Sequence, residues 1–174
     1  MARSCYKNPG TVSDSGSSYG IGVQKLSETE RNSNAMTIMR VLIAGSSDLG
    51  GGMTVEIAAG FCGNFHEESN YNPTALGDHK HSFGLAQWRD GRRTNLENFA
   101  TQIGTSVADV VTQAKFVLYE LNNGEKSAWQ KIKNATTVDD ATELVMKYYE
   151  RPSNYTTLTS RKNAAREIYN LHEG

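Results

Sequence analysis

Apolar side chains return every three or four residues along most of the chain, a spacing that predicts amphipathic helices. Gly, Pro or a capping side chain bounds most of these segments. The first 32 residues show scattered Ser and Gly without this period, so we interpret residues 1–32 as a flexible arm and residues 33–174 as one domain. The predicted helices run from a cap at Asn34 to Gly45, from Thr54 to about Ser69, through Leu96 and Phe99, from Val107 to Leu121, around Trp129 and Ile132, from Thr137 through Tyr148, and from about Ser160 to Leu171.

Two stretches interrupt this helical pattern. Residues 46–52 are typical of a turn, and residues 70–88 hold Pro73, Gly77 and Gly84 among short apolar pieces. The second stretch is too irregular for a helix and favours a loop or small hairpin. Asp90 follows it and has a side chain suited to cap the next helix. The expected fold is therefore mainly α, with a small loop or β-hairpin flanking the helices.

Composition limits the classes of function. The chain has 174 residues, 18 Lys and Arg against 19 Asp and Glu, and a formal net charge of -1. This balance argues against capture of nucleic acid or of a membrane surface, because such binding needs clustered basic residues. The longest apolar stretch, residues 36–44, is broken by Arg40 and is too short to span a membrane. No signal peptide is recognisable, and Cys5 and Cys62 are expected to be free thiols.

The most informative segment is the predicted helix that ends near Ser69. On a helical wheel Glu68 falls in the apolar stripe with Ile57, Phe61 and Phe65, whereas Glu67 falls on the polar side. A carboxyl in apolar surroundings, at the negative end of a helix dipole, retains its proton more readily than a solvated one. Such a group is suited to donate a proton to a leaving group, so Glu68 is our candidate general acid. The alternative is that Glu68 lies solvated in a frayed last turn.

Several short motifs follow one another along the chain: Gly60, Gly63-Asn64, Glu68-Ser69, Tyr71-Asn72-Pro73, the run from Ser82 to Trp88, Tyr149-Glu150-Arg151-Pro152, and Arg161 with Ala165 in the helix that follows. These motifs resemble those of the phage tail lysozymes, a family of peptidoglycan-cleaving domains. The resemblance spans roughly residues 34–171 and implies a lysozyme-like fold with an active-site cleft, similar to that of lytic transglycosylases.

The resemblance implies that Glu68 is the catalytic glutamate and that Ser82, Gly84 and Gln87 belong to the stretch lining the sugar cleft. The Gln87 amide has both a donor and an acceptor for an acetamido or hydroxyl group. Trp88 offers a flat face to a pyranose ring, or else it is a core or lid aromatic.

Three further groups near these motifs carry open alternatives. Tyr149 and Glu150 are expected at the substrate site. Glu150 either orients the cleft or forms a structural salt bridge, for example with Arg151. Arg89, Arg92 and Arg93 either meet carboxylates of the peptidoglycan or form a solvated helix start.

The sequence does not decide which second carboxylate, if any, assists Glu68. Asp78 and Asp90 are both candidates to assist Glu68, although Asp78 also suits a Gly-Asp turn and Asp90 a helix cap. If neither assists, the 6-hydroxyl or acetamido group of the substrate does the nucleophilic work. Attack by the 6-hydroxyl would make the protein a lytic transglycosylase.

Three other classes of site compete with this interpretation. Asp78, His79 and His81, with His66, contain the ligand types of a zinc site but lack a recognised spacing. Cys62 with a histidine base would make a peptidase or amidase that cuts stem peptides. A tail module that binds the wall without cleaving it is the non-enzymatic alternative.

The leading expectation is a muramidase that cleaves the β-1,4 bond between N-acetylmuramic acid and N-acetylglucosamine, with Glu68 as general acid and no cofactor. The expected substrate is bacterial peptidoglycan. Other phage tail or virion proteins are expected to bind through the N-terminal arm. The protein is expected either in the phage tail or in the host cytoplasm before lysis.

Overall fold

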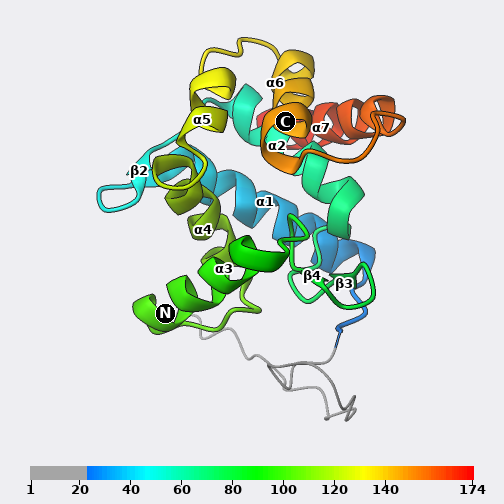
Figure 1. Ribbon diagram of the computed structural model, residues 1–174. Coiled ribbons are helices and arrows are strands. Elements are labelled where there is room, and N and C mark those ends of the chain that lie inside the picture. The colour runs from blue at the N-terminus through cyan, green and yellow to red at the C-terminus, as the bar shows by residue number, and fades with distance from the viewer. Residues whose placement is uncertain (1–22) are drawn as a thin grey trace, which may run out of the picture.

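The computed structural model describes residues 23–174, which form a mainly helical fold with two small antiparallel hairpins (Figure 1). This confirms the expected fold class. The helices are α1 (Glu28–Ala44), α2 (Val55–Ser69), α3 (Asp90–Ile103), α4 (Val110–Asn122), α5 (Lys126–Ile132), α6 (Val138–Val145), the π-helical turn η1 (Met146–Glu150) and α7 (Leu158–Glu173). The hairpins pair β1 (Gly45–Ser46) with β2 (Gly50–Gly51) and β3 (Leu76–Gly77) with β4 (Ser82–Phe83).

Helix α2 lies at the centre of the fold, between α1 and the α6–α7 pair (Figure 1). Residues 57–65 are buried without interruption, as expected for a helix enclosed on all sides. Gly60 and Gly63 make this enclosure possible. A Cβ added at Gly63 would lie 2.4 Å from the Arg161 carbonyl oxygen, and one at Gly60 would lie 2.9 Å from Ala141. The backbones of α6 and α7 therefore pack directly against α2.

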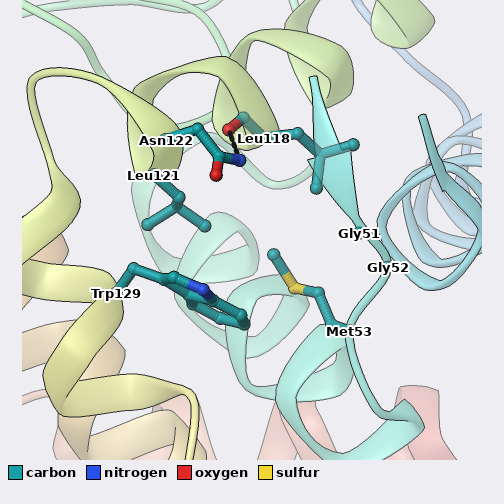
Figure 2. A pocket seen from close by; sticks show the side chains of 7 residues that line it. All are labelled: Gly51, Gly52, Met53, Leu118, Leu121, Asn122 and Trp129. Atoms are coloured by element: carbon teal, nitrogen blue, oxygen red, sulfur yellow. Dashed lines mark hydrogen bonds between the residues drawn. The ribbon is translucent and has the colours of Figure 1, made fainter. Parts of the chain in front are cut away.

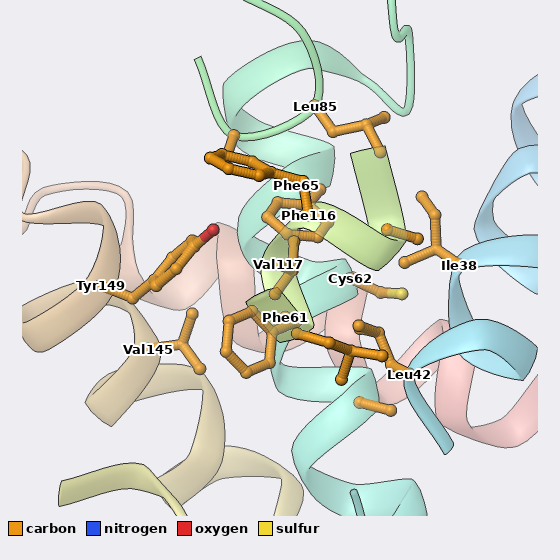
Figure 3. Close-up of a cluster of buried hydrophobic side chains, with 14 of the residues drawn as sticks. Ile38, Leu42, Phe61, Cys62, Phe65, Leu85, Phe116, Val117, Val145 and Tyr149 are labelled. Carbon is orange, nitrogen blue, oxygen red and sulfur yellow. The ribbon is translucent and has the colours of Figure 1, made fainter. Parts of the chain in front are cut away.

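Aromatic rings fill the space between α2, α4 and η1 (Figure 3). Phe61 packs edge-on against Tyr149 with ring centroids 5.2 Å apart, and Phe65 lies 6.0 Å from Phe61. Phe116 of α4 contacts Trp88 with centroids 5.4 Å apart. These contacts link η1 and the loop after β4 to the same core.

The first helix begins earlier than the sequence pattern indicated. Helix α1 starts at Glu28, where Ser27 and Glu30 form a reciprocal capping box. Asn34 is not its cap: the Asn34 side chain donates a hydrogen bond to the Tyr71 carbonyl at 2.9 Å. Gln24 also hydrogen-bonds to Thr74 at 2.8 Å. The described part of the expected arm, residues 23–32, is thus folded against the domain, and residues 1–22 lie outside the described residues.

The second helix and the β3–β4 hairpin agree with the sequence pattern. Thr54 caps α2 by accepting a hydrogen bond from the Ile57 amide at 3.3 Å. The hairpin occupies the irregular stretch after Asn70, and its turn contains three residues with positive φ, Asp78, His79 and Lys80. Within the described chain, no helix is long and apolar enough to cross a membrane.

Because α2 and α7 lie so close together, a single methyl group added between them is expected to destabilise the protein. Gly63→Ala is expected to lower the free energy of unfolding by about 1–3 kcal/mol, because the new Cβ meets backbone atoms of α7 that cannot rotate away. Urea denaturation followed by circular dichroism measures this loss. Gly91→Ala is the matched control, since a Cβ at Gly91 has no atom within 4 Å. Equal effects of the two substitutions would contradict the packing argument.

Candidate active site

Glu68 lies in the last turn of α2 and its side chain is 20% exposed. Helix α2 ends at Asn70, which adopts the left-handed conformation with φ 51°. The Ser69 hydroxyl, next to Glu68, lies 2.8 Å from the Leu85 carbonyl and ties this helix end to the loop after β4. Glu68 is therefore a partly accessible carboxyl on a backbone that is fixed from two sides.

Arg161 of α7 holds the Glu68 carboxylate. Its Nη2 donates to Glu68 Oε1 at 2.8 Å, its Nη1 donates to Asn64 Oδ1 at 2.9 Å, and its Nε donates to Thr157 Oγ1 at 2.9 Å. The guanidinium is almost completely buried, with 4% of the side chain exposed. A buried cation needs a nearby anion, and a cation held by three acceptors in turn fixes the position of that anion.

The helical-wheel separation of the two glutamates agrees with the structure, but the surroundings expected for Glu68 do not. Glu67 is exposed and accepts a hydrogen bond from Ser160 at 2.8 Å, whereas Glu68 faces inward on the side of Phe61 and Phe65. The apolar surroundings expected for Glu68 are incomplete, because Arg161, 93 residues away in the chain, also reaches its carboxylate.

Glu150, the last residue of η1, is the carboxyl that lacks a cation of its own. Its Oε1 is buried and has no hydrogen-bond partner among the described residues. Burial and the nearby negative charge of Glu68 raise the pKa of Glu150 well above its usual range. The possible salt bridge to Arg151 is absent, because Arg151 binds Glu125 at 2.8 and 3.0 Å. Burial therefore favours the protonated form of Glu150.

Trp88 and Tyr149 belong to the core and present no face to a sugar. They are 1% and 0% exposed, so of the two alternatives for Trp88 the structure agrees with the core aromatic and not with a ring that stacks on a sugar. Glu120 of α4 accepts hydrogen bonds from Trp88 Nε1 at 2.8 Å and from the Tyr149 hydroxyl at 2.6 Å. Arg92 of α3 completes this cluster with two hydrogen bonds to Glu120, at 2.8 and 3.0 Å. The cluster joins the loop between β4 and α3 to helices α3 and α4 and to η1.

Ser82, Gly84 and Gln87 shape the loop between β4 and α3. Gln87 Nε2 donates to the Ala75 and Gly84 carbonyls at 3.1 and 2.9 Å, so its amide hydrogens already have acceptors within the loop. Gly84 has φ 83° and lies so close to Gln113 that an added Cβ would be 2.7 Å from its Oε1. Ser82 is 5% exposed. Gly84 and Gln87 thus determine the backbone of the loop, whereas Ser82 is a buried residue of β4.

Asp78 and Asp90 both pair with Arg89 at the protein surface. Arg89 Nη1 lies 2.7 Å from Asp78, and its Nε lies 3.4 Å from Asp90. Asp90 is not the helix cap that we expected: it is the first residue of α3, has φ 51° and makes no capping hydrogen bond. Within residues 23–174, no hydrogen bond or ion pair joins either aspartate to Glu68.

The three neighbouring arginines do not form a common basic surface. Arg92 points inward to Glu120, and Arg89 binds the two aspartates. Arg93 donates to the Lys80 carbonyl at 2.6 Å and lies over the Phe83 ring. Their charges are thus used within the protein, which weakens the expectation that they meet peptidoglycan carboxylates.

A sequence model of the phage tail lysozymes matches residues 33–171, which is most of the chain. The protein belongs to the phage tail lysozyme family. A comparison with curated proteins finds no match. The family indicates a phage-associated protein with peptidoglycan-lytic activity, and it agrees with the resemblance seen in the sequence motifs.

The thiol alternative does not fit this family member. Cys62 is completely buried, with Sγ 3.9 Å from the Ala35 carbonyl, and burial raises the pKa of its thiol. A cysteine nucleophile requires an accessible thiolate, so a peptidase mechanism through Cys62 is excluded in this conformation. For the zinc alternative, the described residues contain no group of three or more His, Cys, Asp or Glu side chains arranged to hold a metal ion.

Two shallow hollows on the tail lysozyme lie away from Glu68. One lies between β2, α4 and α5 and is lined by Gly51, Gly52, Met53, Leu118, Leu121, Asn122 and Trp129 (Figure 2). The other lies along α5 and α6, between Lys131 and Lys147. Neither contains a residue of the Glu68–Arg161 pair.

Two site residues escaped the sequence analysis. Glu120 was not singled out, although it follows Phe116 by four residues and thus falls on the apolar side of its helix, the same signal that pointed to Glu68. Asn64 was noted only as part of a motif. Its side chain lies between Arg161 and the Gly60 and Thr142 carbonyls, which no local pattern reveals.

The buried carboxyl of Glu150 predicts how stability changes with pH. Because the pKa of Glu150 is raised in the folded state, its contribution is greatest below the ordinary glutamate pKa and is lost as the pH rises toward the folded value. Glu150→Gln does not titrate. The free energy of unfolding of this variant, relative to wild type, is expected to rise with pH above about 4.3, by up to about 1.4 kcal/mol per unit.

Urea denaturation of both proteins between pH 4 and pH 8 measures this difference. Glu143→Gln is the control, since its two lysine partners lower the pKa of Glu143. That variant should show the opposite trend, with stability falling relative to wild type as the pH rises. A Glu150→Gln difference that does not depend on pH would contradict the raised pKa.

Proposed function

We propose that the protein is a muramidase that cleaves the β-1,4 bond between N-acetylmuramic acid and N-acetylglucosamine in peptidoglycan, with Glu68 as the general acid. The family supports a peptidoglycan-lytic activity. The observation that carries the role of Glu68 is its geometry: it is a partly exposed carboxyl whose position is held by a buried arginine. Glycosidic cleavage requires a carboxyl that is both accessible to the bridging oxygen and held in place.

The two oxygens of Glu68 have different tasks in this proposal. Oε1 accepts the hydrogen bond from Arg161 and sets the orientation of the carboxyl plane. Oε2, which has no protein partner in the described structure, carries the proton to the glycosidic oxygen as the bond breaks. The same oxygen then takes a proton from the incoming nucleophile, so one residue acts first as acid and then as base.

A lytic transglycosylase is the second candidate, and the positions of the two aspartates favour it. Asp78 and Asp90 share the cation of Arg89 and make no contact with Glu68. The buried Oε1 of Glu150 has no hydrogen-bond partner among the described residues, and burial disfavours the ionised form that a carboxylate nucleophile requires. Within residues 23–174, no second carboxylate is bound beside Glu68, so in this second candidate the 6-hydroxyl of N-acetylmuramic acid is the nucleophile, and its attack yields a 1,6-anhydro product.

The family indicates a phage-associated protein, and we propose two settings in which it could act. A tail-associated enzyme would open the wall locally while the genome is delivered, and a lysis enzyme would act from the host cytoplasm. In the first setting, the residues before Val23 would attach the domain to other virion proteins.

The proposed function is tested by analysing the products released by variants of two neighbouring glutamates. Glu68→Gln is expected to lower the rate of release of soluble fragments from purified peptidoglycan by about 10²–10⁴-fold, because an amide cannot supply the proton. Glu67→Gln is the matched control, since Glu67 is one position away but exposed. It should retain wild-type activity. The rate is measured by mass spectrometry of the soluble products, with thermal unfolding to show that both variants fold.

The chemistry of the product ends separates the two candidates. Reducing N-acetylmuramic acid ends identify a muramidase, and 1,6-anhydro ends identify a transglycosylase. Full activity of Glu68→Gln, or fragments cut only in their peptides, would overturn the glutamate mechanism.

A further inference from the structure

The hollow between β2, α4 and α5 lies at the opposite end of α2 from Glu68. Met53, which directly precedes the cap of α2, lines this hollow, whereas Glu68 lies in the last turn of the same helix (Figure 2). An α-helix rises about 1.5 Å per residue, so the 15 residues of α2 separate the two places by about 22 Å. The β2–α4–α5 hollow is therefore separate from the candidate active site.

Apolar atoms line most of the β2–α4–α5 hollow. Met53 and the α4 residues Leu118 and Leu121 contribute hydrocarbon side chains, and the half-buried Trp129 of α5 contributes an aromatic ring. The hollow has a volume of about 130 Å³. A cavity of about 150 Å³ in another protein takes up one benzene molecule. The hollow thus has room for a small substituent of a larger ligand and not for a whole disaccharide.

Two polar atoms at the hollow have no hydrogen-bond partner among residues 23–174. The Asn122 amide nitrogen donates to the Leu49 and Leu118 carbonyls at 2.5 and 3.0 Å, which leaves Asn122 Oδ1 as a free acceptor. The indole Nε1 of Trp129 makes no hydrogen bond and is not buried, so it is a free donor. In Figure 2 the Asn122 oxygen and the Trp129 ring lie on two sides of Leu121.

An acetamido group matches this arrangement. It has one N–H donor, one carbonyl acceptor and one methyl group. The N–H and carbonyl of a trans amide point in opposite directions, so their partners must lie on opposite sides of the group, as Asn122 and Trp129 do. The methyl group would contact the leucine side chains. Both sugars of peptidoglycan carry an acetamido group, which a plain hydroxyl-bearing sugar lacks.

We propose that the β2–α4–α5 hollow is a second glycan-binding site, which takes the acetamido group of an N-acetylhexosamine and has no part in bond cleavage. Asn122 Oδ1 accepts from the amide N–H of the sugar, and Trp129 Nε1 donates to its carbonyl. The site holds the protein on a glycan strand while Glu68 acts elsewhere on the polymer. The choice of ligand rests on the proposed function, whereas binding itself does not depend on Glu68.

Titration with two trisaccharides tests this site. Triacetylchitotriose carries an acetamido group on each sugar, and cellotriose has a hydroxyl in its place. The chain has two tryptophans, and Trp88 is 1% exposed with its Nε1 bound to Glu120, so two indole N–H signals in a ¹⁵N correlation spectrum report on the core and on the hollow. The Trp129 signal is expected to shift saturably with triacetylchitotriose and to stay unmoved with cellotriose. No shift, or equal shifts with the two sugars, would overturn the proposal.

Two neighbouring asparagines form a matched pair of variants. Asn122 donates to the Leu118 carbonyl at 3.0 Å and Asn123 donates to the Tyr119 carbonyl at 2.8 Å, but only Asn122 lines the hollow. Asn122→Ala is expected to weaken the binding of triacetylchitotriose about five- to tenfold, because one hydrogen bond to the ligand is lost. Asn123→Ala should bind as wild type does. The Trp129 signal measures both affinities, and equal losses would contradict the assignment.

The hollow and the active site can fail separately. Glu68→Gln is expected to show the same Trp129 shift as wild type, because Glu68 lies at the far end of α2. Full activity of this variant would overturn the proposed function and leave the shift standing. An unmoved Trp129 signal in a protein that needs Glu68 would overturn the second site alone. A shift produced by free stem peptides and not by triacetylchitotriose would also overturn it, since the ligand would then be a peptide.

Discussion

The buried guanidinium of Arg161 is the constraint on which the site depends. With 4% of its side chain exposed, it would cost several kcal/mol if it were left unpaired, so its partners must be in place whenever α7 is packed. Asn64 and Glu68 are those partners on α2. Gly63, directly before Asn64, permits the backbones of α2 and α7 to approach closely enough for the contacts to form. The position of the candidate catalytic carboxyl therefore follows from the need to neutralise a cation in the interior.

A second buried charge group extends this rigidity to the other side of the site. Glu120 accepts hydrogen bonds from Trp88, Tyr149 and Arg92, which come from the hairpin loop, η1 and α3. Removing any one donor would leave part of a buried carboxylate unsatisfied, so these elements are held together as a unit. Glu150 directly follows Tyr149, so this second group also sets the position of its backbone.

The sequence predicted well what depends on local spacing and poorly what depends on contacts between distant residues. Apolar periodicity located most helices, and the helical wheel separated Glu68 from Glu67 correctly. The start of α1 was missed although Ser27 and Glu30 form a capping box, because the surrounding Ser and Gly suggested an arm. The Arg161–Glu68 pair joins residues 93 positions apart, and the Trp88–Glu120 hydrogen bond joins residues 32 apart. No periodicity encodes such pairs, so the ionic surroundings of Glu68 were not foreseeable, and the sequence could not decide between the two alternatives for Trp88.

The motif residues divide between one accessible carboxyl and the framework that holds it. Ser69 and Gln87 hydrogen-bond to backbone carbonyls, and Tyr149 lies in the core, whereas one oxygen of Glu68 has no partner among residues 23–174. A site with one accessible carboxylate needs a second chemical function from elsewhere, because bond cleavage requires both a proton and a nucleophile. Asp78 and Asp90 are bound to Arg89, and burial disfavours the ionised form of Glu150. In the proposed mechanism the nucleophile therefore comes from the substrate or from water, and Glu68 supplies the proton to the glycosidic bond.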